Sequence, residues 1–326
     1  VVFLTVIFIP KFVKNKKVFV VLPLTLVLIT AFDVYRFATK WQPFEPRRLV
    51  YPEVPVSKFL YSNAGADRVF GNFGGEASMM LRSPSVEGYD PLYSQRYGEF
   101  LEAASDGSLR LPPRSGVSMS KTGKFTPKMI NILGIKYFVN KEADDRKVWG
   151  FPIWTYPIEQ FSIVYEDRAY QVFLNRKSYP RVLMLGDIKV VSDKQKILDA
   201  MFDEKTDLKQ TVIFEEDVGL KIEKDASAAA VIKKYAPNRI EVETDANKQQ
   251  VLLLTDPYYP GWVARVDGSP TRIYRVDYTF RGVYVPAGKH NMTFTYEPES
   301  FRMGMVLAII GIAGTVGLAR FIRLRA

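Results

Sequence analysis

The sequence predicts a membrane-anchored α+β protein, in which transmembrane helices flank a mixed α+β extracytoplasmic domain and a C-terminal antiparallel β-sandwich. Three observations support this prediction. An uncharged apolar run lies near each end of the chain, at 18–32 and at 303–319. Between them, segments with helical spacing alternate with short apolar strands. After residue 225, strands separated by Gly and Pro turns follow one another, which is typical of packed antiparallel sheets.

This pattern divides the chain into four parts. Residues 1–40 comprise the end of a truncated transmembrane helix, a basic cytoplasmic loop and one transmembrane helix. Residues 41–224 form the extracytoplasmic α+β domain, and residues 225–301 form the extracytoplasmic β-sandwich. Residues 302–326 form the C-terminal transmembrane helix and a basic cytoplasmic tail. The chain begins without Met inside an apolar run, so we expect further transmembrane helices before it.

Two basic clusters set the predicted topology. Four lysines precede the first long apolar run and three arginines follow the last one: Lys11, Lys14, Lys16, Lys17, Arg320, Arg323 and Arg325. Because basic residues concentrate on the cytoplasmic side of a membrane, both clusters are expected inside the cell. The chain is then part of a multi-pass plasma-membrane protein with residues 33–302 extracytoplasmic, and the lipid bilayer is its first expected partner.

The composition excludes several classes of function. All 35 acidic residues fall within 33–302, and seven of the 45 basic residues lie in the two basic clusters, which leaves 38 basic against 35 acidic residues between them. The net charge of +10 therefore comes mostly from the two basic clusters that set the topology, and we expect no nucleic-acid partner. Without cysteine, the chain has no disulfides, zinc–thiolate sites or cysteine nucleophile.

Both kinds of secondary structure are expected in the α+β domain. The predicted strands are 68–72, 135–139 and two within 161–174, and the predicted helices are 93–104, 127–133 and one through 202 that Ser192 caps. Gly71, Gly74 and Gly75 resemble a glycine-rich phosphate loop. No Gly-Lys-Ser/Thr or Rossmann pattern follows them, so a flexible turn is the better interpretation.

The β-sandwich is most clearly marked around Tyr258–Gly268. The predicted strands there are 240–244, 251–255, 263–266, 271–275, 281–285 and 291–296. Asp267-Gly268 is a tight-hairpin signal, because Gly tolerates the positive φ that such turns require. The strand 271–275 is expected to pair back onto 263–266. The strand 240–244 alternates apolar and acidic residues and opens the sandwich.

A family resemblance extends along most of the chain. The segments LLLTDPYYPGWVARVDG and IYRVDYTFRGVYVPAGKHNMTFTYEP resemble the C-terminal signature of bacterial YfhO-type membrane proteins. Further pieces occur upstream in the same order: DVYRF at 33–37, EGYDPLYSQRYGEFL at 87–101, NILGIKYFV at 131–139 and NRKSYPR at 175–181. The resemblance implies a GT-C class membrane glycosyltransferase that moves a sugar from a polyprenyl-phosphate donor to a cell-envelope glycan or polymer.

The chain also departs from what a complete GT-C enzyme needs. In that class the catalytic carboxylate usually lies in the first outer loop, and this chain does not contain that loop. We therefore expect no catalytic residue, no metal and no cofactor in this chain, and an incomplete enzyme. The alternative is a non-catalytic extracytoplasmic module that binds glycan or scaffolds partners in the cell envelope.

Two groups of candidate binding residues precede the sandwich. Asp33 and Arg36 lie at the outer end of the first predicted transmembrane helix, where Arg36 is able to meet lipid-phosphate oxygens. Alternatively, they are ordinary helix-end charges at the headgroup level. Tyr89, Asp90 and Arg96 form a polar and aromatic group before a helix. They are either a substrate-facing loop or a structured turn.

The third candidate group belongs to the sandwich. Tyr258, Tyr259 and Trp262 offer an aromatic platform for a sugar or a lipid, or else they pack in the core and at its rim. The only histidine, His290, has no evident partner beside its predicted turn. A Ser-His-Asp triad needs partners beside its histidine and a multi-histidine metal site needs further histidines, so His290 is interpreted as a surface residue.

Overall fold

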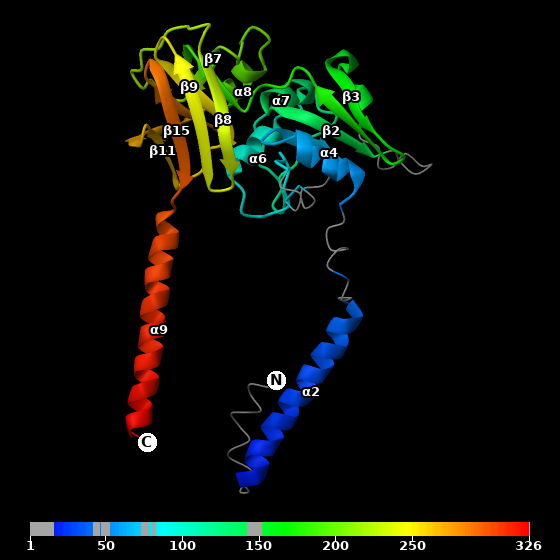
Figure 1. Ribbon diagram of the computed structural model, residues 1–326, viewed down its shortest axis with the longest axis vertical. Helices are drawn as coiled ribbons and strands as arrows, with labels where there is room; N and C mark the ends of the chain where they lie inside the picture. Colours follow the sequence, from blue (N-terminus) through cyan, green and yellow to red (C-terminus); the bar gives the residue numbers. More distant parts are fainter. Residues whose placement is uncertain are drawn as a thin grey trace. The chain divides into compact units, whose positions relative to one another are not determined.

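The computed structural model describes residues 16–41, 46, 53–72, 78–79, 83–141 and 152–325 (Figure 1). The chain divides into two compact units, Val1–Glu53 and Val54–Ala326. The first unit contains helix α2 (Lys16–Trp41), which includes the apolar run predicted to span a membrane. Lys11, Lys14, Gly74 and Gly75, on which other predictions depended, lie outside the described residues.

The second unit contains three sheets. The smallest has the order β1-β2-β4-β3, and its strands are β1 (Arg68–Gly71), β2 (Ile135–Lys141), β3 (Phe161–Glu166) and β4 (Tyr170–Asn175). Strands β1 and β2 are parallel, whereas β2, β4 and β3 are antiparallel neighbours. The expected strands of the α+β domain therefore form one mixed sheet.

The other two sheets contain the C-terminal strands. The six-stranded sheet has the order β5-β10-β14-β13-β7-β6, with β5 (Val182–Leu185), β6 (Asp187–Val190), β7 (Thr211–Phe214), β10 (Gln250–Pro257), β13 (Ile273–Val276) and β14 (Phe280–Val285). The five-stranded sheet has the order β12-β11-β15-β9-β8, with β8 (Ala229–Ala236), β9 (Arg239–Ala246), β11 (Trp262–Val266), β12 (Ser269–Thr271) and β15 (Gly288–Tyr296).

Helices in the second unit are short, apart from the last one. They are α4 (Pro55–Asn63), α6 (Gln95–Glu102), α7 (Thr126–Ile132), the 3-10 turns η2 (Ile153–Thr155) and η3 (Ile158–Gln160), α8 (Lys194–Phe202) and α9 (Glu299–Arg325). Helix α7 starts with Thr126-Pro127 and is followed by Gly134, whose φ of 62° suits a helix end. Asp193, and not the predicted Ser192, caps α8, because its carboxylate accepts the N–H of Lys196.

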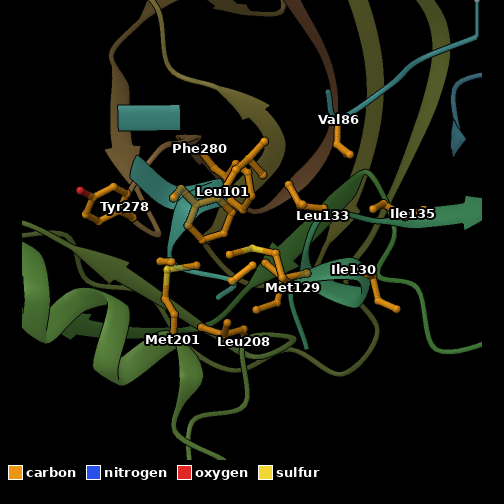
Figure 2. Packing of buried hydrophobic residues seen from close by; sticks show 14 of the residues in the cluster. Val86, Leu101, Met129, Ile130, Leu133, Ile135, Met201, Leu208, Tyr278 and Phe280 are labelled. Carbon is orange, nitrogen blue, oxygen red and sulfur yellow. The ribbon is translucent and has the colours of Figure 1, made fainter. Parts of the chain in front are cut away.

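The largest core joins helices to the six-stranded sheet. Buried side chains from α6, α7 and α8 meet residues of β2, β7 and β10. Figure 2 shows Leu101, Met129 and Met201 in this cluster with Tyr278 and Phe280. Val251 and Leu253 of β10 enter it, and the alternate residues Leu252 and Leu254 enter another cluster. Because β10 is buried on both faces, its sequence is a continuous apolar run instead of an alternating one.

A second core contains residues of both C-terminal sheets. Buried side chains from β5, β10 and β14 meet those from β9, β11 and β15. In β9 the side chains of Ile240, Val242 and Thr244 are buried alternately, as the sequence pattern predicted. The six-stranded sheet also takes in β5, β6 and β7 from the chain before residue 225. The proposed division at residue 225 and the β-sandwich remain predictions.

One predicted strand, 271–275, is wrong as drawn from the sequence. Asp267 and Gly268 adopt φ values of 49° and 83° and form the expected hairpin, but the returning strand is β12, which ends at Thr271. After Arg272 the chain joins the other sheet as β13, where Ile273 pairs with Val283. The apolar segment thus serves two sheets, which a local pattern does not reveal.

The described residues include one helical segment long and apolar enough to cross a membrane. It is Glu299–Leu318, within α9, and none of it is buried inside the protein. Its large apolar side chains, such as Leu307 and Ile309, are more than half exposed. The sequence placed a transmembrane helix at this position.

Candidate functional site

A buried aspartate, Asp256, is the centre of the most polar region in the core. It lies near the end of β10, after a run of apolar residues, and only 5% of its surface is exposed. Three arginines surround it: Arg68, the first residue of β1; Arg181, just before β5; and Arg281 on β14. We call these four residues the Asp256 cluster.

Arg68 and Arg181 bind the carboxylate directly. An Nη2 of Arg68 lies 3.0 Å from Oδ1 of Asp256, and the same nitrogen donates to the carbonyl of Thr255 at 2.6 Å. Arg181 forms a close ion pair with the same oxygen and donates to the hydroxyl of Tyr235 at 2.8 Å. The Tyr235 hydroxyl in turn donates to Oδ2 of Asp256 at 3.2 Å. The cluster therefore ties β1, β5 and β8 to β10.

Arg281 completes the cluster from the neighbouring strand. Its Nε donates to the carbonyl of Pro257 at 2.9 Å, and its guanidinium lies 3.9 Å from the centre of the Trp262 ring. Nη1 of Arg281 and Nε of Arg181 are buried and have no hydrogen-bond partner among the described residues. Three guanidinium groups thus face a single carboxylate.

The charges explain the pKa values in the cluster. Burial alone would raise the pKa of Asp256, but Arg181, Arg68 and Arg281 together hold it at about 2. Burial lowers the pKa of Arg68 and Arg281, and Asp256 raises that of Arg181 against the effect of burial. Because guanidinium groups remain protonated in proteins, the cluster has three positive charges and one negative charge at neutral pH.

A cavity of about 700 Å³ borders Arg181. Its walls come from the α4–β1 turn, β2, the segment between β4 and β5, and β8: Asn63, Ala64, Gly65, Ala66, Asp67, Lys136, Leu174, Asn175, Arg176, Ser178, Tyr179, Pro180, Arg181, Val182, Ala230, Val231 and Ile232. Its volume is in the range of small-ligand sites.

The first predicted pair, Asp33 and Arg36, lies on α2. The carboxylate and the guanidinium are 3.5 Å apart, one helical turn from each other, and their side chains are 72% and 76% exposed. These residues belong to the first unit, and the structure brings no other predicted site residue to them within it. Their role at a lipid phosphate stays a prediction.

The second predicted group is divided by the fold. Tyr89 is 81% exposed, and Asp90 accepts the N–H of Leu92 at 2.7 Å in a turn. Arg96, by contrast, forms an ion pair with Glu215 and lies 4.5 Å from the centre of the Tyr278 ring. Arg96 therefore packs against the core that Figure 2 shows around Tyr278.

The aromatic group of the third prediction is partly assembled. The ring of Trp262 lies 5.5 Å from that of Tyr296, and the ring of Tyr259 lies 6.4 Å from that of Tyr296. Tyr259 is 44% exposed, whereas Tyr258 is half-buried with the guanidinium of Arg275 4.9 Å from its ring. We call Tyr259, Trp262 and Tyr296 the aromatic group.

His290 has a partner that the sequence did not suggest. Its Nδ1 lies 2.6 Å from Oδ2 of Asp267, in the β11–β12 hairpin, and Asp267 raises the pKa of the imidazole. The hairpin and β15 are neighbours in the five-stranded sheet, which explains the contact.

Comparison with known proteins finds a similarity in the C-terminal part of the chain. Residues 204–308 match the family described as "Bacterial membrane protein YfhO". By this match, the C-terminal part of the chain is similar to that family. The uncharacterized protein YfhO of Bacillus subtilis (strain 168) is 27% identical over 75 residues, which cover 23% of this chain and 9% of the relative. This chain thus spans a small part of the length of that relative.

One solved structure also shows a match. The arabinofuranosyltransferase AftD from Mycobacteria, solved by cryo-EM, is 28% identical to this chain, with 21% of this chain and 5% of that chain covered and a TM-score of 0.20. The YfhO region runs from the loop before β7 into α9 and includes Asp256 and Arg281. The earlier segments that resemble the family, from 33 to 181, lie before the matched region.

Sequence reasoning missed the Asp256 cluster. A signal was present, because Asp256 directly follows an apolar strand in LLLTDP, and Arg181 and Arg281 each adjoin apolar strand residues. A charged residue inside a buried strand needs a partner of opposite charge. The sequence does not say which partner, because Arg68 is 188 positions away from Asp256.

Proposed function

We propose that this chain is the C-terminal portion of a polytopic membrane protein that acts in glycosyl transfer at the cell envelope. The proposed reaction moves a sugar from a polyprenyl-phosphate donor to an envelope glycan or polymer. The observation that carries the proposal is the YfhO match over 204–308, which includes the five-stranded sheet and four strands of the six-stranded sheet and extends into the apolar helix α9. The segments upstream that resemble the same family support it.

The chain itself is proposed to bind and position the substrate, and not to catalyse the sugar transfer. A general base needs a pKa near the working pH and access to the acceptor. Asp256 meets neither condition, because three arginines hold its pKa at about 2 and it is buried. As the family resemblance implies, we propose that the catalytic carboxylate lies in a part of the parent that this chain does not include.

The proposed topology puts residues 33–302 outside the cytoplasm, with α2 and α9 as membrane spans. Reporter fusions after Asn15 and inside the second unit test it. We expect a cytoplasmic signal from the first and an extracytoplasmic signal from the second. A cytoplasmic signal from the second fusion contradicts the proposal.

The activity is tested by sugar incorporation from a polyprenyl-phosphate donor into membranes that contain the full-length parent or this chain alone. We expect transfer by the parent, reduced transfer by Asp33→Asn, and none by this chain alone. Trp262→Ala is expected to affect acceptor binding or folding, because the Trp262 ring contacts both Arg281 and Tyr296. Sugar transfer by this chain alone would refute its non-catalytic role. Absence of sugar transfer by the parent would refute the proposed glycosyltransferase activity.

A second candidate function is a non-catalytic glycan-binding or scaffolding module of the cell envelope. The aromatic group favours it, since Tyr259 is half-exposed beside Tyr296 and Trp262. Sedimentation with purified envelope glycan separates the two candidates. For this second candidate, Tyr259→Ala should weaken sedimentation while Tyr61→Ala, an exposed tyrosine on α4, leaves it unchanged. Equal sedimentation of both variants with the unchanged protein contradicts it.

A further inference from the structure

The cavity beside the Asp256 cluster has a positive wall. Three cationic side chains line it, Lys136, Arg176 and Arg181, against one carboxylate, Asp67. Lys136 is paired with Asp67 at 2.6 Å. Arg176 is exposed, and its guanidinium has no partner among the described residues. The side chains that line the cavity thus have two positive charges in excess.

Arg181 connects this wall to the buried charges behind it. Its side chain is 3% exposed, and it lines the cavity while it binds Asp256 and donates to the carbonyl of Ala66 at 2.6 Å. Its Nε has no partner among the described residues. Asp256 is shared with Arg68 and Arg281, so it neutralises only one of three guanidinium groups. Buried cations without enough counter-charge are costly, and an anion in the cavity would reduce that cost.

The rest of the lining is neutral. Asn63, Ser178 and backbone groups provide hydrogen-bonding atoms, and Tyr179, Val231 and Ile232 provide apolar surface. This mixture suits the hydroxyl and C–H faces of a sugar better than a long acyl chain. Arginine in particular matches the geometry of phosphate and carboxylate oxygens.

We propose that this cavity binds a small sugar that carries an oxyanion, either a phosphate or a carboxylate, with the oxyanion at Arg176 and Arg181. The site does not require glycosyl transfer. Because binding is measured without a lipid donor, a parent that lacks transferase activity would not contradict this site. Conversely, a cavity that binds no sugar would not contradict the proposed transfer reaction.

Isothermal titration calorimetry of the full chain in detergent tests the site. Glucose 1-phosphate represents the phosphate source and glucuronate the carboxylate source, while glucose is the uncharged control. We expect saturable binding of at least one anionic sugar and none of glucose. The stronger of the two anions identifies the source. Absence of binding by both anions, or equal binding of glucose, overturns the proposal.

Two variants locate the site. Arg176→Gln removes an exposed cation from the lining and should weaken binding about tenfold, as expected for one charge-assisted hydrogen bond. Lys177→Gln is the matched control, because it removes the same charge one residue away, outside the lining. Val231→Trp, at a 55% exposed position in the lining, should block the cavity without changing any charge. Equal weakening by Arg176→Gln and Lys177→Gln, or full binding by Val231→Trp, overturns the proposal.

Discussion

Asp256 and Asp277 are both buried and lie in a strand and in a turn of the same six-stranded sheet, but their surroundings are opposite. Asp256 lies among three arginines. Asp277 lies in the turn between β13 and β14, where its carboxylate accepts the N–H of Ile213 at 2.8 Å and its own N–H donates to the Ile213 carbonyl at 2.9 Å. Burial raises the pKa of Asp277 to about 7, whereas the arginines hold that of Asp256 at about 2.

The comparison shows that burial alone does not decide the charge of a carboxylate. Desolvation acts on both aspartates, and the nearby arginines of Asp256 are what oppose it most strongly. Asp256 works as a charge that joins arginines from three segments. Asp277 works as a hydrogen-bond acceptor that holds β7 to the β13–β14 turn, which is a task that a neutral group also performs. Substitution by asparagine, which keeps shape and removes charge, separates these two roles.

The largest effect is expected for Asp256→Asn. The substitution leaves three buried guanidinium groups without a counter-charge, and breaking such a buried pair costs about 3–5 kcal/mol. We expect the free energy of unfolding of the full chain, measured by denaturant titration at pH 7, to fall by this amount. A change close to zero would show that Arg68 and Arg181 do not depend on the carboxylate.

A smaller change of opposite sign is expected for Asp277→Asn. Asn retains the acceptor for Ile213 and tolerates the φ of 44° at this position. The pKa of Asp277 is raised from 3.8 to about 7, so its contribution to stability is complete below pH 3.8 and is lost as the pH rises towards 7. Thermal unfolding should therefore show that Asp277→Asn stabilises the chain at pH 7 and not at pH 4. Destabilisation at pH 7 contradicts the proposed neutral role.

The smallest effect is expected for His290→Gln, which removes the pair between His290 and the exposed Asp267. Asp267 raises the pKa of His290 above 6.5, so the contribution of the pair is complete below pH 6.5 and is lost as the pH rises through the raised pKa. The melting temperature of His290→Gln should fall slightly relative to the unchanged chain at pH 5.5, and the difference should shrink at pH 8.5. Solvent screening keeps the change below that of either buried variant. An equal difference in melting temperature at both pH values would show that the charge of His290 does not cause it.

Local patterns predicted many elements of the second unit. The alternation in 240–244, the apolar run in 251–255 and the Asp267-Gly268 turn each give the element that the structure contains. The strand proposed at 271–275 fails, because a run of suitable residues does not show that the chain changes sheets after Arg272. The candidate residues Tyr259 and Trp262 meet in one aromatic group through Tyr296, whereas Arg96 pairs with Glu215 and Tyr89 is exposed.

The sequence by itself determined the elements whose cause is local: the apolar run of α9, the tight hairpin and the helix end at Gly134. It also determined the family resemblance, because that depends on ordered segments. Only the tertiary structure decided which charges meet. Arg68 and Arg181 reach Asp256 across 188 and 75 positions, so their pairing depends on how β1, β5 and β10 pack. The cavity has the same origin, because its walls come from four separate segments that no local pattern connects.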